Sequence, residues 1–144
     1  MLGLDVGERR IGVAVCDADE RVAVPLAIID RHETPDAVRR VVEIARREGA
    51  ERVVIGLPLS LDGTVGPQAR TVQRFGRALE AAGVTVDYWD ERLTTAQIER
   101  RPSRPPRRGE RRQPLRRPAA SDDLVAAAIL QNYLDARRAG GAAP

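Results

Sequence analysis

The sequence has very few aromatic residues: one Trp, two Tyr and one Phe make up 3% of its 144 residues. The core must therefore be aliphatic, and nucleic-acid binding by stacking bases on a row of aromatic rings is disfavoured. The single cysteine, Cys16, cannot form an internal disulfide, and no stretch approaches the roughly 18 consecutive apolar residues of a membrane span. The N-terminus also lacks the features of a signal peptide. We therefore expect a cytoplasmic protein without a membrane partner.

The chain contains no lysine and one histidine, His32. Its glycine-containing segment 56–63 therefore lacks the lysine of a phosphate-binding P-loop. His32 lies in a polar stretch, which favours a solvated loop residue over a catalytic base. Cys16 has no histidine partner, and zinc has no ligand set. These absences argue against a P-loop nucleotide site, a histidine general base, a Cys–His catalytic pair and a zinc site.

The length and the 42% hydrophobic content suit one domain with its own core. We expect residues 1–138 to form that domain and residues 139–144 to form a flexible tail. A two-lobed kinase is excluded by size, and an actin-like phosphate-binding lobe lacks its second lobe here.

Hydrophobic periodicity predicts an α/β protein. Residues 2–6 and 11–15 alternate as in a hairpin, and residues 22–29 form an edge strand because Pro25 lies inside them. A helix follows, capped by Thr34 with Pro35 at its first position and ending near Gly49, and then a strand over 53–55 that Gly56 ends. Next come a helix opened by Pro67 and a strand over 84–89. The chain closes with a short helix begun by Thr94 and a largely buried helix that is capped by Ser121 and runs to about Arg138.

An antiparallel meander followed by right-handed crossovers predicts a five-stranded mixed sheet with strand order 3-2-1-4-5, flanked by helices. Ligand sites in such sheets lie at the carboxyl ends of the parallel strands, where the strand order reverses. Asp5, at the end of the first strand, falls at that point.

Three acidic residues can converge there: Asp5, Glu91 after the last strand, and Asp122 in the first turn of the last helix. Mg²⁺ and Mn²⁺ prefer oxygen ligands, and two such ions could activate water for in-line displacement at a phosphodiester. Each of the three residues can also be interpreted without a catalytic role. Asp5 could be a turn former, Asp122 could serve the helix dipole, and Glu91 lies in an ordinary charged cluster.

The basic residues are unevenly distributed. Residues 100–117 hold nine arginines against one acid, Glu110, a local charge of +8, and half of the ten prolines lie between residues 102 and 118. We expect residues 100–120 to be a mobile loop that attracts a polyanion. Together with the carboxylates, this loop predicts a nuclease.

Four blocks of residues extend in order over nearly the whole chain: Gly3-Leu4-Asp5-Val6-Gly7 with Arg10-Ile11-Gly12-Val13-Ala14, Gly56-Leu57-Pro58-Leu59 with Asp62-Gly63, Asp90-Glu91-Arg92-Leu93-Thr94, and Asp122 leading to Ile129-Leu130-Gln131. Together they resemble the YqgF/RuvX family. The resemblance implies a ribonuclease H-like fold and a cytoplasmic, metal-dependent nuclease related to the RuvC resolvases. Family members are assigned to 5′-end maturation of the 16S ribosomal RNA precursor, and some are regarded as Holliday-junction resolvases.

Carried over by position, the resemblance implies that Asp5, Glu91 and Asp122 are the catalytic residues and hold two Mg²⁺ or Mn²⁺ ions. Counting back nine residues from Gln131 selects Asp122 over its neighbour Asp123. The predicted fifth strand is not adjacent to the first, so Glu91 must reach across the end of the fourth. Asp62 or Asp90 could take its place.

The expected partner is nucleic acid, either a 16S ribosomal RNA precursor or branched DNA, bound through its backbone. A homodimer is expected if two strands of a junction are cut. The alternative function is a non-catalytic nucleic-acid-binding module. The arginines expected to contact nucleic acid are Arg9, Arg10, Arg92, Arg104, Arg107, Arg108, Arg111 and Arg112.

Overall fold

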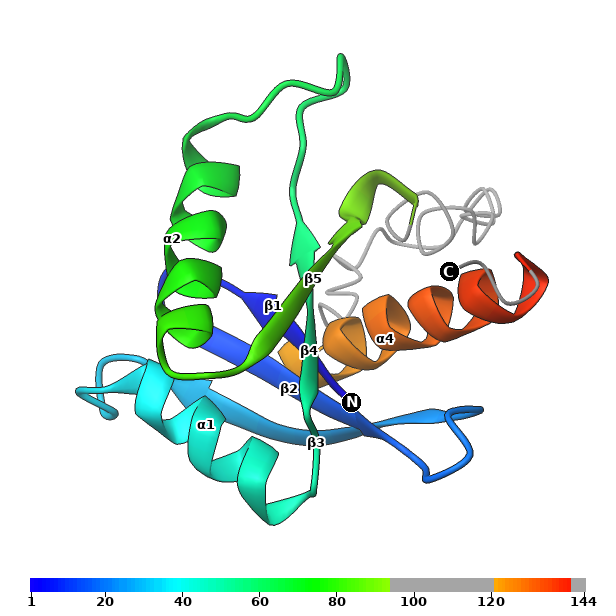
Figure 1. Cartoon of the computed structure of the whole chain (residues 1–144). Helices are drawn as coiled ribbons and strands as arrows, with labels where there is room; N and C mark the ends of the chain where they lie inside the picture. The colour runs from blue at the N-terminus through cyan, green and yellow to red at the C-terminus, as the bar shows by residue number, and fades with distance from the viewer. Residues whose placement is uncertain (94–120, 141–144) are drawn as a thin grey trace, which may run out of the picture.

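A computed structural model of the chain describes residues 1–93 and 121–140. Its five strands form one mixed sheet with the order β3-β2-β1-β4-β5, which confirms the predicted topology. The antiparallel meander consists of β1 (Leu2–Val6), β2 (Arg10–Cys16) and β3 (Ala23–Asp30). The two later strands, β4 (Arg52–Leu57) and β5 (Thr85–Asp90), run parallel to β1 (Figure 1).

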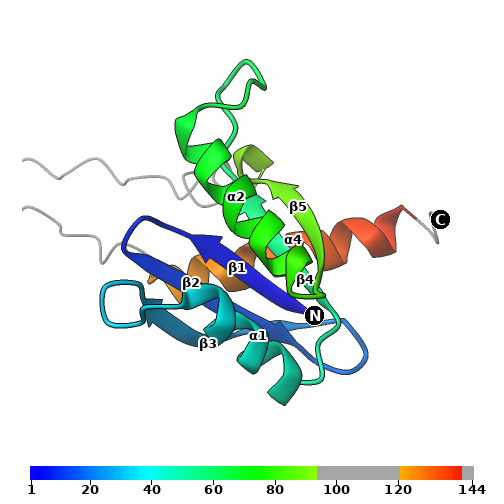
Figure 2. The same ribbon diagram turned by 60° about the vertical axis from the view of Figure 1, so that its left-hand side comes forward.

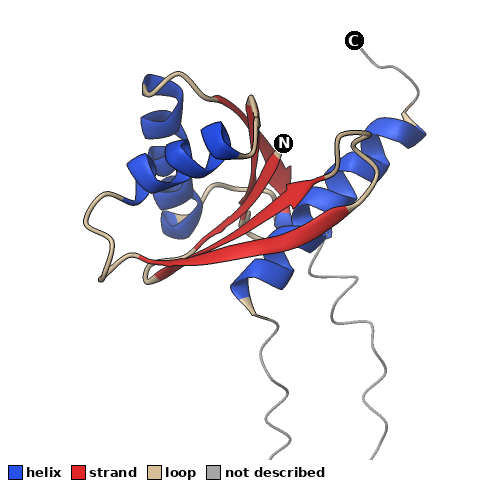
Figure 3. Cartoon of the chain, turned by 90° about the horizontal axis from the view of Figure 1, so that it is seen from below, coloured by secondary structure: helices blue, strands red, loops and turns tan. Residues whose placement is uncertain are grey.

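The helices cover the two faces of the sheet. The helices α1 (Ala37–Arg47) and α2 (Pro67–Ala81) lie on one face, and α4 (Asp122–Ala139) crosses the other (Figures 1 and 2). The view from below shows the sheet as the middle of three layers (Figure 3). Within the described ranges 1–93 and 121–140, no helix is long and apolar enough to cross a membrane.

The two faces of the sheet carry side chains of different size. Branched aliphatic residues such as Leu4, Val13 and Ile55 are fully buried against α1 and α2. The face toward α4 is lined by small residues: Gly3 on β1, Gly12 and Ala14 on β2, and Gly56 on β4. A small-residue surface lets a helix pack unusually close to a sheet, and this closeness builds the site described below.

The helix α1 begins later than the sequence predicted. Its N-cap is Asp36, whose side chain accepts a hydrogen bond from the Arg39 N–H at 3.0 Å. The Thr34 N–H instead donates to the Asp30 carbonyl, in a turn that the Asp30 side chain also holds. The predicted start at Thr34 and Pro35 is therefore wrong, because this turn occupies the chain until Asp36.

Replacing Asp36 with Ala should lower the free energy of unfolding by about 1 kcal/mol, since an N-cap acceptor is lost. Urea denaturation measures the change. Thr34→Ala is the control and should cost clearly less. An equal or larger cost at Thr34 would contradict this assignment of the cap.

Other boundaries and the burial of one helix also differ from expectation. Gly56 pairs with Trp89 inside β4 rather than ending that strand. Residues 91–93 are already helical, so a helical turn begins before Thr94, which itself lies outside the described residues. The helix α4 starts after Ser121 as predicted, but only one face of it is buried, and its last turn is exposed. The predicted loop over 100–120 also lies outside the described residues. The tail predicted over 139–144 starts too early, because Ala139 is the last residue of α4 and Gly140 is its C-cap, and residues 141–144 lie outside the described residues.

Candidate active site

Asp5 lies near the carboxyl end of β1, on the face of the sheet covered by α4. Its backbone pairs with Gly12 on β2, and the adjacent β1 residue, Leu4, pairs with Ile55 on β4. Gly12 and Gly56 therefore flank Asp5 on either side. The Asp5 side chain is half-buried at the point where the strand order reverses, as the sequence predicted.

Glu91 reaches Asp5 by passing over β4. A Cβ atom added to Gly56 would lie 2.5 Å from Glu91 Oε1 and 2.9 Å from its Cγ, so the Glu91 side chain occupies the space that any larger residue at position 56 would need. The predicted strand order left β4 between Glu91 and Asp5. Gly56 provides the space for the Glu91 side chain to cross, and a glycine directly after the apolar run Val53–Ile55 is a signal for it that is visible in the sequence.

The carboxyl groups of Asp5 and Glu91 are in direct contact. Burial, followed by the charge of Asp122, raises the pKa of Asp5 to about 6, while a hydrogen bond from Glu91 opposes the rise. Burial, the charge of Asp5 and the same hydrogen bond raise the pKa of Glu91 to about 7. Glu91 is thus the protonated member of the pair, and its carboxyl O–H donates a hydrogen bond to the Asp5 carboxylate. Two carboxyl groups held together in this way supply oxygen donors for a hard cation.

This pair should make the metal-free protein less stable as the pH rises. The unfolded chain ionises Glu91 near its ordinary pKa of 4.5, whereas the folded chain holds the proton to about pH 7. The stability contributed by the protonated Glu91 is therefore fully present below pH 4.5 and is lost as the pH rises to about 7. Partial solvent exposure reduces the effect, and we expect a loss on the order of 1–2 kcal/mol.

Urea denaturation at pH 5 and pH 8 in the presence of a chelator measures this loss. Glu91→Gln keeps a hydrogen-bond donor and cannot ionise, so its stability should depend less on pH. A parallel decline in the parent and in this variant would rule out the pair as the cause.

Asp122 stands close to this pair without joining it. The start of α4 rests on β2: a Cβ at Gly12 would lie 1.8 Å from the Asp122 carbonyl oxygen. The Asp122 carboxylate forms an ion pair with Arg10, with Nε to Oδ2 at 3.1 Å. In the described part of the chain, no three His, Cys, Asp or Glu side chains are grouped closely enough to hold a metal ion. Asp5 and Glu91 are thus the two carboxyl groups in contact, and Asp122 is held beside them by Arg10.

The two alternative acids have other partners. The Arg92 guanidinium forms three hydrogen bonds with the Asp90 carboxylate, at 2.6 to 3.0 Å, and lowers the pKa of that group. Asp62 is exposed and accepts hydrogen bonds from the backbone and the hydroxyl of Thr64, which lower its pKa. Neither carboxylate is directed at Asp5 by these contacts.

The predicted nucleic-acid contacts that are described lie around the same edge. Arg9 and Arg10 are exposed at the β1–β2 turn and start of β2, and Arg9 lies 4.0 Å from Asp30. Arg92 also donates to the Leu61 carbonyl at 3.3 Å, which ties the loop 58–66 to the end of β5. The other predicted contacts lie outside the described residues: Arg104, Arg107, Arg108, Arg111 and Arg112.

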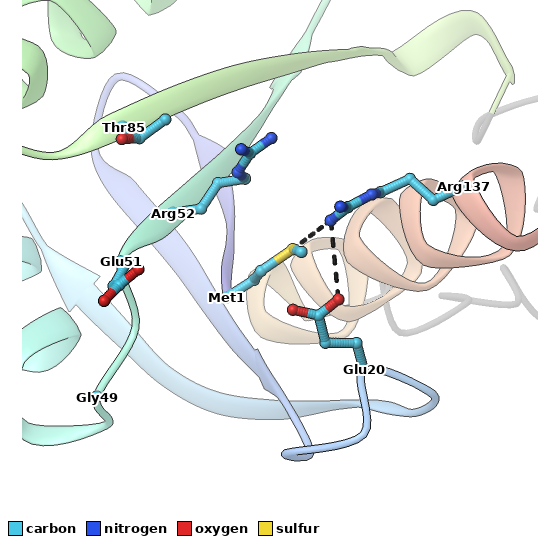
Figure 4. Close-up of a pocket in the computed structure, with 7 residues that line it drawn as sticks. All are labelled: Met1, Glu20, Gly49, Glu51, Arg52, Thr85 and Arg137. Carbon is cyan, nitrogen blue, oxygen red and sulfur yellow. Dashed lines mark hydrogen bonds and ion pairs between the residues drawn. The ribbon is translucent and has the colours of Figure 1, made fainter. Parts of the chain in front are cut away.

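An open pocket of about 330 Å³ lies at the opposite edge of the sheet, where β4 and β5 begin (Figure 4). Its two guanidinium groups already have partners. Arg52 pairs with Asp87 and Tyr133, and Arg137 contacts Glu20 and the Met1 sulfur. This pocket is remote from Asp5, and the contacts of Arg52 and Arg137 with other side chains of the protein explain its polar lining.

Comparison with known proteins agrees with this picture. The family model described as "RuvX: Holliday junction resolvase" matches residues 1–136. Relatives carry the name "Putative pre-16S rRNA nuclease". One from Chloroflexus aurantiacus is 45% identical over 96% of this chain and 88% of its own length. Another, from Caldanaerobacter subterraneus, is 39% identical over 96% and 97%.

Solved structures share the fold at low sequence identity. RuvC of Thermus thermophilus, in complex with a Holliday junction substrate, aligns with a TM-score of 0.59 and 18% identity, covering 95% of this chain and 94% of that one. A second structure of the same protein gives 0.54 and 16%, with 96% and 95% covered. The ribonuclease H-like fold expected from the sequence is thereby confirmed.

Proposed function

The chain belongs to the RuvX family of nucleases, and from this premise we propose that it cleaves the 16S ribosomal RNA precursor in a metal-dependent reaction. The observation that carries the proposal is the contact between the Asp5 and Glu91 carboxyl groups at the carboxyl edge of the sheet. Relatives named for this RNA cover nearly the whole chain, which favours RNA as the substrate. A four-way DNA junction is the second candidate, supported by the family description.

We propose that Asp5, Glu91 and Asp122 would hold two Mg²⁺ or Mn²⁺ ions. When bound, such ions activate water and stabilise the leaving oxygen of a phosphodiester. For its part, Glu91 must lose the proton that it shares with Asp5. Asp122 must be released by Arg10, whose guanidinium is then free for a substrate phosphate. Arg10 thus exchanges one anionic partner for another as substrate arrives.

The remaining parts of the proposal concern the surroundings of the site. Residues 1–138 act as one nuclease domain in the cytoplasm. Arg9 and Arg92, together with the arginines of 100–120, contact the phosphate backbone and carry little sequence information. A homodimer would supply two sites if both strands of a junction are cut.

The test is to incubate the protein with a labelled 5′-extended 16S precursor and with a mobile four-way DNA junction. Reactions contain Mg²⁺, Mn²⁺ or a chelator, at low salt because phosphate-driven affinity falls steeply with salt. We expect metal-dependent cleavage of the RNA. Cleavage of the junction alone would transfer the proposal to DNA. Tight binding of both without cleavage would favour a non-catalytic module.

A further inference from the structure

The outer face of α2 carries a row of three exposed arginines, Arg70, Arg74 and Arg77, which we term the α2 stripe. Their spacing of four and three residues places them on one side of the helix, opposite the buried Val72 and Leu79. Together with Val65 and Gln73 they line an open groove. Among the described residues, none of the three forms an ion pair with a carboxylate within 4.0 Å, in contrast to Arg10 and Arg92.

Helix stability does not account for these charges. The stripe puts like charges at i,i+4 and i,i+3, which repel, and α2 has no acidic residue in its first turn and no basic one in its last. The arginines of α1 show the opposite arrangement. Arg39 and Arg40 pair with Glu43, while Arg46 and Arg47 occupy the last turn, where cations are favoured. An anionic partner outside the described chain would balance the charges of the stripe.

We propose that the α2 stripe binds the phosphate backbone of a double-stranded segment of the substrate, away from the scissile bond. The inference rests on the proposed function only in taking nucleic acid as the substrate. From Arg70 to Arg77 the helix rises about 10 Å, enough for guanidinium groups to contact several phosphates. The one aromatic residue of α2, Phe75, is buried at 6% exposure, so bases of a single strand find no ring on which to stack there.

The position of the stripe explains how it complements the site. The helix α2 begins directly after the loop 58–66, which Arg92 ties to the end of β5 beside Glu91. It then runs along the face of the sheet opposite to α4 (Figure 2). A duplex arm extending from the carboxyl edge of the sheet would follow this helix. Contacts of this kind select for a helical arm near the cleavage point rather than for a sequence.

The experiment compares two triple variants that lose the same charge. Arg70→Gln/Arg74→Gln/Arg77→Gln removes the stripe, and Arg39→Gln/Arg46→Gln/Arg47→Gln on α1 is the control. Binding of a short blunt-ended RNA duplex is measured against salt concentration with a chelator present. Removing the stripe should weaken binding roughly tenfold and reduce the slope of log K against log salt by about 2 to 3, whereas the control should change much less. The stripe variant should also unfold at an equal or higher temperature, because repulsion within α2 is relieved.

Equal losses in the two triple variants, or an unchanged salt slope without the stripe, would overturn the inference. A larger loss on a single-stranded RNA of the same length would also overturn it. Cleavage by the parent protein is scored separately. If the parent cleaves nothing but the stripe variant alone loses duplex binding, the proposed function fails and the stripe assignment stands. If the parent cleaves and the stripe variant binds duplex normally, only the stripe assignment fails.

Discussion

Replacing Asp5 with Asn should abolish metal-dependent cleavage while leaving the fold intact. Asp5 is the carboxylate at the centre of the site, in contact with Glu91 and within the electrostatic influence of Asp122. Asn cannot supply the negative charge that holds a divalent cation. Because metal assistance is worth several kcal/mol of barrier, we expect a rate loss of roughly 10³-fold or more. Gel-based cleavage of the preferred substrate, in Mg²⁺ and in Mn²⁺, measures it.

The same substitution should stabilise the metal-free protein at alkaline pH. The folded state raises the pKa of Asp5 from 3.8 to about 6, so ionisation of Asp5 lowers the free energy of unfolding progressively between these two pH values, and Asn removes this loss. We expect a gain on the order of 1–2 kcal/mol at pH 8 that vanishes near pH 4. Asp19→Asn, an exposed aspartate with the same chemical change, is the control and should leave cleavage and stability unchanged. Metal-dependent cleavage that persists in Asp5→Asn would remove Asp5 from the catalytic centre.

The strand order was predictable because local patterns determine it. The alternation over residues 2–6 and 11–15, the apolar run at Val53–Ile55 and the helix opening at Pro67 each indicate an element, and right-handed crossovers leave few topologies. The position of Asp5 beside the reversal of strand order follows from that topology alone. These features depend on residues near one another in the sequence.

The sequence predicted that Glu91 must pass over the end of β4, but not how, because contacts between carboxylates depend on which faces of distant elements meet. The passage of Glu91 requires the glycine at position 56, and the ion pair of Arg10 with Asp122 requires α4 to start over β2. Neither contact is visible in the spacing of charged residues. The late start of α1 has a similar origin, since the turn at Asp30 competes with the Thr34 cap.

Small residues on the α4 face link the fold to the site. Gly3 and Gly12 let α4 lie against the sheet, and Gly56 gives the Glu91 side chain its path. With side chains at these positions, the three acids could not approach one another. The carboxylate arrangement is therefore a consequence of helix–sheet packing rather than of the acids themselves.

Replacing Gly12 with Ala should accordingly be among the most damaging single changes to this protein. The new Cβ would lie 1.8 Å from the Asp122 carbonyl oxygen and 2.8 Å from the Asp123 nitrogen, and both are backbone atoms. The start of α4 would have to move, at a cost of about 3 kcal/mol or more. Cleavage should fall as well, since displacing a catalytic group by about 1 Å can cost 10²-fold.

A series of Gly→Ala variants distinguishes the effect of close packing at Gly12 from a general effect of replacing glycine with alanine. The nearest contact of an added Cβ lengthens from 1.8 Å at Gly12 to 2.7 Å at Gly3 and 3.3 Å at Gly140. Urea denaturation should therefore give the largest loss for Gly12→Ala, a smaller one for Gly3→Ala, and nearly none for Gly140→Ala. Gly3 contacts α4 at Leu130 and Ala126, away from Asp122, so Gly3→Ala should retain more cleavage per folded molecule than Gly12→Ala. If Gly12→Ala were as stable and as active as Gly140→Ala, α4 could not pack on β2 at this distance, and Asp122 would have to reach the site by another route.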